Sequence, residues 1–147
     1  MKKKISLVLL IIWMIVIFWL SACSASESSS QSGFLTGIVC KIFNIKNVEL
    51  ASTIIRKLAH LTEFFILGVL TINYIRFYSI KHKYLISIGF CFLYACSDEF
   101  HQMFVPGRAG QITDVLIDVF GVILGCGIFY IISKFHKNTC KKRIKHI

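Results

Sequence analysis

The stretch ISLVLLIIWMIVIFWLSA, which occupies Ile5–Ala22, decides the class of this protein. It contains no charged side chain, and it comes close to the run of about 20 predominantly apolar residues that a helix needs to cross a bilayer. Three lysines, Lys2, Lys3 and Lys4, come directly before it. We therefore interpret this segment as a membrane-spanning helix near the start of the chain.

The composition of the whole chain supports this interpretation. Of its 147 residues, 56% are hydrophobic and only 16% are charged, whereas soluble domains contain about 45–50% apolar and about 25% charged residues. The hydrophobic content excludes a disordered chain, and one proline with nine glycines excludes a collagen-like one. The class that remains is an integral membrane protein.

Three further apolar stretches follow, each interrupted by a few ionisable residues: Leu58–Ile75, Tyr84–Val105 and Ile112–Ser133. Because backbone groups in lipid must be hydrogen-bonded within the segment, each stretch is expected to be a helix. The alternating pattern of a membrane β-barrel is missing from the sequence. The sequence thus predicts an all-α bundle of about four transmembrane helices. Its expected parts are a first helix (1–22), an outer loop (23–55), a three-helix core (56–133) and a basic tail (134–147).

The distribution of basic residues predicts the orientation of these helices. A net charge of +10 on a soluble domain would suggest nucleic-acid binding. Here, however, most of the 17 basic residues lie beside the apolar stretches, on the side that the N-terminus shares. Basic segments of this kind stay in the cytoplasm. We therefore expect both termini in the cytoplasm, and we do not expect nucleic-acid binding.

The segment after the first helix carries two further signals. Leu20-Ser21-Ala22-Cys23 is similar to a bacterial lipoprotein cleavage site, but the apolar core before it is longer than the usual 7–15 residues of a signal peptide. We therefore favour a retained helix over acylation of Cys23. Further on, apolar residues recur at helical spacing in Phe34–Phe43, which predicts either a short helix on the outer membrane surface or a packed loop helix. The topology also permits a disulfide between Cys23 and Cys40.

Ionisable residues within the apolar stretches form the candidate site. In the predicted orientation, all seven acidic residues fall in the outer loop or the outer halves of helices. A charged group at the bilayer centre costs about 2.5–3.5 kcal/mol on insertion scales, so these groups need a partner, a proton, water or a bound cation. Helical spacing places Lys57, His60 and Glu63 on one helix face, and Asp114 and Asp118 on one face of another helix.

Three chemistries fit these side chains. A His–carboxylate pair can act as general acid and base; the candidates are His60, Glu63, Asp98, Glu99, His101 and Asp118. Histidines and carboxylates can also hold a divalent metal ion; the candidates are His60, Glu63, Asp98, His101 and Asp118. A pocket fringed by basic residues can bind a phosphate or carboxylate of an envelope lipid; the candidates are Lys57, Gln102, Arg108 and Asp114.

Most of these groups also have a purely structural interpretation. His60 and Glu63 can form a pair within one helix. Asp114 can cap the N-terminus of the last helix, where carboxylates are favoured, whereas Asp118 lies one turn too deep for this role. The carboxylates of Asp98 and Glu99 can be paired with basic residues, for which Arg56, Lys57 and Arg108 are available.

Two features concern packing and turns. Val105-Pro106-Gly107-Arg108 is expected to make a tight turn, from which Arg108 can fold back over the carboxylates as a counter-ion. Gly121 and Gly125 form a Gly-x-x-x-Gly pattern, which is expected to let two helices approach closely.

The motifs that contain these residues resemble the VanZ-like family of small bacterial membrane proteins. The resemblance covers roughly residues 50–130 and is carried by three motifs: Arg56-Lys57-x-x-His60-x-x-Glu63-Phe64, Ser97-Asp98-Glu99-x-His101-Gln102-x-Phe104-Val105-Pro106-Gly107-Arg108, and Asp114-Val115-x-x-Asp118-x-x-Gly121. The family is named for a protein that raises resistance to teicoplanin, a glycopeptide antibiotic with a lipid tail. The resemblance implies a protein of the bacterial cytoplasmic membrane, and it does not supply a biochemical mechanism.

Three functions remain open on the sequence alone. The first is a non-enzymatic envelope protein that lowers glycopeptide susceptibility, with membrane lipids, the antibiotic or a cell-wall precursor as partners. The second is a membrane-embedded enzyme, with or without a divalent metal, that acts on an envelope lipid or a wall precursor. The third is a structural role, in which the polar residues only hold the helices together. The oligomeric state is not predicted.

Overall fold

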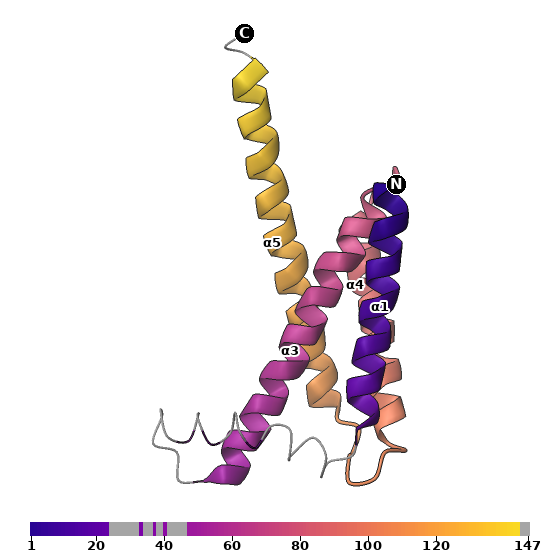
Figure 1. Cartoon of the computed structure of the whole chain (residues 1–147), viewed down its shortest axis with the longest axis vertical. Coiled ribbons are helices and arrows are strands. Elements are labelled where there is room, and N and C mark those ends of the chain that lie inside the picture. The colour runs from indigo at the N-terminus through magenta and orange to yellow at the C-terminus, as the bar shows by residue number, and fades with distance from the viewer. Residues whose placement is uncertain (24–32, 34–36, 38–39, 41–46, 145–147) are drawn as a thin grey trace.

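The protein is a bundle of long helices in the part of the chain that the structure describes. The computed structural model describes residues 1–23, 33, 37, 40 and 47–144, with backbone only for 137–144. The four helices are α1 (Lys2–Ala22), α3 (Val48–Ile75), α4 (Lys83–Gln102) and α5 (Ile112–Ile144), and these described residues contain no strand (Figure 1). The predicted all-α fold is confirmed. The helix predicted within Phe34–Phe43 lies outside the continuous described segments.

Three of the helices are long and apolar enough to cross a membrane: α1, α3 and the part of α5 from Ile112 to His136. The fourth helix, α4, has 20 residues. Its mean hydropathy is too low for this group because Asp98, Glu99 and His101 lie in its last turns. Large apolar side chains point outward from every helix, as they must where a helix faces lipid. Examples are Ile15, Leu93 and Ile132, each more than 60% exposed.

Two helix boundaries differ from the prediction. Helix α3 begins at Val48, ten residues before the predicted apolar stretch, because the side chain of Asn47 accepts a hydrogen bond from the backbone N–H of Leu50 and caps the helix. Residues 48–55, assigned above to the outer loop, therefore belong to α3. At the other end of the chain, α5 continues through the basic segment to Ile144.

The connection between α4 and α5 contains the predicted tight turn. The N–H of Arg108 donates to the carbonyl of Val105 over 3.1 Å. Gly107 has a φ of 76°, a left-handed conformation that glycine adopts without strain, and Pro106 precedes it. The predicted span to Val105 is too long, since α4 ends at Gln102 and single-turn hydrogen bonds replace the helix from Met103 to Val105.

Helices α3 and α5 form the most extensive contact in the bundle and cross each other near its middle (Figure 1). Three glycines make this crossing possible. A Cβ atom added to Gly121 would lie 2.5 Å from the carbonyl oxygen of Leu61, and one added to Gly68 would lie 2.8 Å from that of Val122. A Cβ atom on Gly125 would overlap the carbonyl oxygen of Phe65. The Gly-x-x-x-Gly pattern is therefore a packing feature, as predicted.

Helix α1 is joined to the others by hydrogen bonds as well as by packing. The indole N–H of Trp13 donates to the carbonyl of Glu63 in α3 over 2.9 Å, and the hydroxyl of Tyr94 in α4 donates to the carbonyl of Met14 over 2.6 Å. The fully buried side chain of Ile17 belongs to the same apolar core as Phe64 and Leu67 of α3. Cys23 and Cys40, between which the topology permits a disulfide, are both free thiols.

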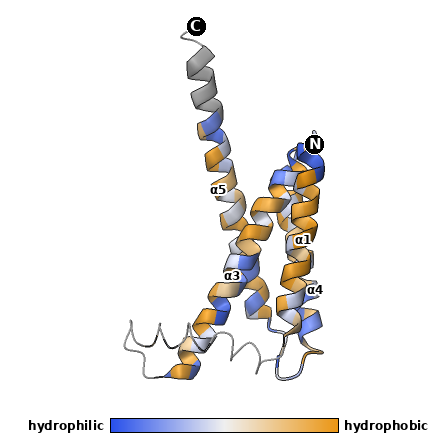
Figure 2. Ribbon diagram, viewed as in Figure 1, coloured by the Kyte–Doolittle hydropathy of each residue, from blue (hydrophilic) through white to orange (hydrophobic). Residues whose placement is uncertain are grey.

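The two ends of the bundle differ in charge. We call the end that holds the last turns of α1 and α4, the first half of α3 and the first two turns of α5 the polar end. The opposite end, with Lys2–Lys4, Arg76–Lys83 and Lys134, is the basic end. Most hydrophilic positions lie toward these two ends, and mostly apolar positions lie between them (Figure 2). The ammonium group of Lys3 lies 3.9 Å from the ring centroid of Tyr78, so the start of α1 meets the basic connection between α3 and α4.

Candidate functional site

Six polar side chains from three helices are buried together at the polar end. We call this set the buried polar cluster, and each member is at most 6% exposed. Its members are His60 of α3, Asp98, Glu99 and Gln102 of α4, and Asp114 and Asp118 of α5. Buried polar groups of this kind are costly unless they are paired, so their partners decide what the cluster can do.

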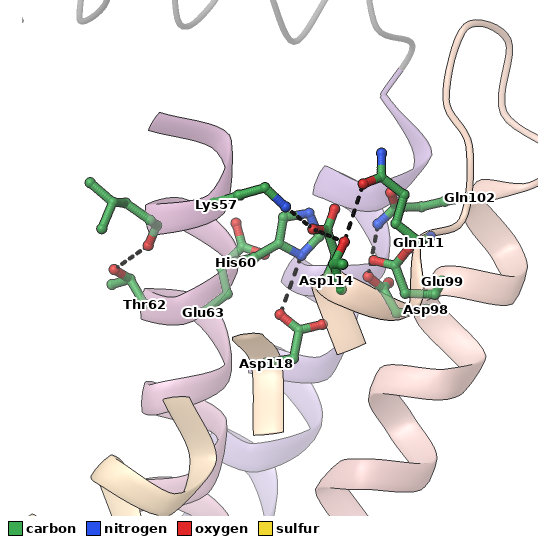
Figure 3. Close-up of polar contacts among 12 residues, drawn as sticks. Lys57, His60, Thr62, Glu63, Asp98, Glu99, Gln102, Gln111, Asp114 and Asp118 are labelled. Carbon is green, nitrogen blue, oxygen red and sulfur yellow. Dashed lines mark hydrogen bonds and ion pairs between the residues drawn. The ribbon is translucent and has the colours of Figure 1, made fainter. Parts of the chain in front are cut away.

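Three of the four carboxylates are each held by a lysine, a side-chain amide or a backbone N–H, and the fourth, Asp118, faces His60 (Figure 3). The ammonium group of Lys57 forms an ion pair with Asp114 at 2.5 Å. The side-chain amide of Gln102 donates to Asp98 Oδ2 over 3.1 Å, one turn along α4. The backbone N–H of Gln111 donates to Glu99 Oε2 over 2.8 Å, and so ties the start of α5 to α4. Each of these bonds fixes the position of a carboxylate while leaving part of its hydrogen-bonding capacity free.

His60 and Asp118 face each other from α3 and α5. The distance from His60 Nδ1 to Asp118 Oδ1 is 3.4 Å, which is long for a hydrogen bond. Neither of these atoms has a hydrogen-bond partner among the described residues, and the same holds for Asp118 Oδ2, Asp98 Oδ1 and Glu99 Oε1. Unpaired buried atoms are rare in proteins, and each asks for an explanation.

One group within the cluster has the arrangement of a metal site. Single donor atoms of His60, Glu99 and Asp118 all lie within 4.8 Å of one another, and all three residues are buried. The sequence selected His60 and Asp118 as metal ligands, and Glu99 only as a catalytic candidate. The structure brings Glu99 into this group and leaves the other metal candidates, Glu63, Asp98 and His101, outside it.

The remaining predicted residues lie at the edge of the cluster. The ring of His101 packs against Phe18 of α1 with 4.4 Å between centroids. Glu63 is half-buried. Among the described residues, Arg108 forms no ion pair with a carboxylate within 4.0 Å, and its guanidinium donates to the carbonyl of Leu20 over 3.4 Å, at the end of α1. The counter-ion role of Arg108 stays a prediction.

The structural alternatives raised by the sequence can now be judged. His60 contacts Asp118 rather than Glu63. Asp98 and Glu99 are held by Gln102 and by the Gln111 backbone rather than by basic side chains. Asp114 does lie in the first turn of α5, but it pairs with Lys57. The sequence did not point to Gln111, because it contacts Glu99 through its backbone N–H, a group that every residue except proline has.

A family model described as VanZ/LLP1 matches residues 6–133, which include most of α1, all of α3 and α4, and most of α5. The chain therefore belongs to the VanZ/LLP1 family. No curated protein and no solved structure matches the chain.

Proposed function

We propose that this VanZ/LLP1 protein acts at the outer face of the bacterial cytoplasmic membrane and lowers susceptibility to teicoplanin-type glycopeptides. The orientation follows from the positive-inside rule, because the end of the bundle that carries Lys2–Lys4, Arg76 and Lys83 should remain in the cytoplasm. The polar end then faces outward, where lipid-tailed antibiotics and exported wall precursors are present.

The observation that carries this proposal is the buried polar cluster with its unpaired atoms. Ionisable residues within membrane spans are expensive, so a protein that keeps them unpaired is expected to use them. Of the four expected ligand-binding residues, Gln102 and Asp114 belong to the cluster, whereas Lys57 and Arg108 are partly exposed. Lys57 is 32% exposed although it pairs with Asp114, and Arg108 is partly exposed near the end of α1. Both cations can therefore reach an anionic group that approaches from outside.

Teicoplanin susceptibility in a strain that lacks this gene tests the proposal. The strain would carry an empty vector, the wild type, Asp118→Asn, His101→Ala or Lys134→Ala, with membrane abundance matched by immunoblot. We expect the wild type and Lys134→Ala, a change at the basic end, to protect, and both polar-end variants to lose protection. If the wild type gives no protection, the antibiotic role is wrong. Full protection by the polar-end variants would make the cluster structural.

A second function is favoured by the contact between His60 and Asp118. A buried imidazole beside a carboxylate is a suitable general acid and base, so the protein can instead be an enzyme acting on an envelope lipid or a cell-wall precursor. This alternative predicts that deletion of the gene changes the amount of one envelope lipid or precursor, and that Asp118→Asn fails to restore it. An unchanged lipid and precursor profile would count against the enzyme.

A further inference from the structure

We propose that His60, Glu99 and Asp118 bind one divalent metal ion of the Zn²⁺ and Mn²⁺ class. The inference concerns the same cluster as the proposed function, but it rests only on the geometry and charge of these three side chains.

The geometry requires little change to close around an ion. The three donor atoms come from α3, α4 and α5 and lie within 4.8 Å of one another. Metal–ligand bonds to imidazole nitrogen and carboxylate oxygen are about 2.0–2.2 Å long. An ion placed among these atoms would therefore need them to move inward by only a small amount, and the contact from His60 to Asp118 is already 3.4 Å.

The charge of the site also calls for a cation. Glu99 and Asp118 are 5% and 0% exposed, and two carboxylates buried together would repel each other in a medium of low dielectric. Lys57 pairs with Asp114 and Arg108 donates to the carbonyl of Leu20, so neither cation forms a described ion pair with Glu99 or Asp118. A divalent cation would balance two carboxylates, and neutral His60 would complete the ligand set.

Donor atoms of all three residues lack a hydrogen-bond partner, and His60 Nδ1 faces Asp118 Oδ1 at a distance of 3.4 Å that is long for a hydrogen bond. Neither oxygen of Asp118 has a hydrogen-bond partner in the described part of the chain, and the same is true of Glu99 Oε1 and His60 Nδ1. The second oxygen of Glu99 is held by the N–H of Gln111, an arrangement in which an outer partner orients a ligating carboxylate. In an ordinary group of acidic residues the carboxylates are exposed to water, whereas these donor atoms are buried and have no described hydrogen-bond partner.

The donor types select the class of metal. One imidazole and two carboxylates form a mixed nitrogen and oxygen set, which suits Zn²⁺ or Mn²⁺ better than Mg²⁺ or Ca²⁺, which prefer oxygen ligands alone. Three protein ligands leave at least one coordination position free, as in catalytic zinc sites. A bound water, or an anionic group of a ligand, would fill it.

Metal content of the full-length protein tests the inference. The protein, purified in detergent without a histidine tag, would be stripped with EDTA, incubated with Zn²⁺ or Mn²⁺ in separate samples, and freed of unbound metal. Elemental analysis should find about one ion per wild-type chain with at least one of the two metals. We expect Asp118→Asn and Glu99→Gln to weaken binding by at least the roughly 10–100-fold that changes in the outer shell of metal sites cost.

Asp114→Asn is the matched control. Asp114 lies one turn before Asp118 on α5 and is equally buried, but it pairs with Lys57, so its removal should leave the metal content unchanged. Thermal melting checks that the variants fold. Zn²⁺ or Mn²⁺ should raise the Tm of the wild type and not that of Asp118→Asn. In EDTA, Asp118→Asn should melt no lower than the wild type, because it removes a buried repulsion.

Two results would overturn the cation site. One is a wild type that binds neither metal; the other is a metal content equal in the wild type, Asp118→Asn and Glu99→Gln, as binding to surface histidines and cysteines would produce. These results are independent of the antibiotic phenotype. Metal binding without any effect on teicoplanin susceptibility would leave the cation site standing and refute the proposed function. The reverse result would refute only the cation site.

Discussion

The two halves of the α3–α5 pair differ in packing: the half near the polar end is closely packed, and the half near the basic end is open. Around Gly121 and Gly125 the two backbones touch, and the polar side chains beside them are buried. Cys126 and Phe129 still pack on the apolar core, but farther along α5 diverges from the bundle, and Ile132 and Phe135 are more than 60% exposed (Figure 1). In the closely packed half, only residues small enough for the helix contact fit at the glycine positions. In the open half, any apolar side chain suits a surface that faces lipid.

The charged residues follow the same division. At the basic end, a pocket of about 750 Å³ opens between α5 and the ends of α3 and α4, lined by Arg76, Lys83 and Lys134. Arg76 lies 5.5 Å from the ring of Phe129, and Lys83 lies over Tyr84. These cations lie against aromatic rings beside open space, so they need no buried partner. The carboxylates of the polar end are buried, and each one that lacks a partner raises the free energy of the fold.

The largest effect is expected where the two halves meet. Gly125→Ala places a Cβ atom against the carbonyl of Phe65, and a backbone atom cannot move aside without moving α3. We expect a loss of about 3 kcal/mol in the free energy of unfolding, the upper range for overpacking. Gly127→Ala is the control, since a Cβ atom there meets nothing within 4 Å.

Unfolding of both variants in detergent, followed by circular dichroism, would measure this difference. Gly127→Ala should be as stable as the wild type or gain up to about 1 kcal/mol, because alanine favours helix more than glycine does. Equal losses for the two variants would show that α3 and α5 do not cross at Gly125.

A smaller loss is expected when one charge is removed from each end. Lys57→Ala leaves Asp114 buried without its cation, and we expect a loss of about 1–2 kcal/mol because water can reach the partly exposed site of Lys57. Lys134→Ala at the basic end should change stability by less than about 0.5 kcal/mol. The double variant Lys57→Ala with Asp114→Asn should recover most of the loss. Failure of Asp114→Asn to rescue would show that the ion pair is not formed in the membrane protein.

The helices of the bundle were predictable because their signal is local. Runs of apolar residues and the Pro106-Gly107 turn need no knowledge of tertiary contacts, and each predicted stretch does contain one helix, although several helix ends differ. The start of α3 was not predictable from hydropathy. Residues 48–57 mix polar and apolar side chains, and only the cap from Asn47 marks the boundary.

The arrangement within the polar cluster was predictable only in part. Spacing along one helix placed His60 with Lys57 and Asp114 with Asp118, but the rotation of α4 about its axis decides whether Asp98 or Glu99 approaches α3 and α5. These two residues are adjacent in sequence and about 100° apart around the helix. The packing of Cys91 against Thr71 and of Ala95 in the core sets that rotation, and both contacts are invisible in a single sequence.

The smallest effect is expected for the hydrogen bond that joins α1 to the close half of the pair. Trp13→Phe removes the donor to the Glu63 carbonyl, which still accepts the N–H of Leu67 within α3 and is not left unsatisfied. We therefore expect a loss of only about 0.6 kcal/mol, the average for hydrogen bonds between membrane helices. Trp19→Phe is the matched control, since the Trp19 side chain is 63% exposed, and its effect should be smaller still. The free energies of unfolding of both variants would be measured in the same detergent.

If Trp19→Phe reduced the free energy of unfolding as much as Trp13→Phe does, the face that α1 presents to α3 would differ from the one described. The polar end would then lack the wall that α1 provides through Phe18 and Leu20.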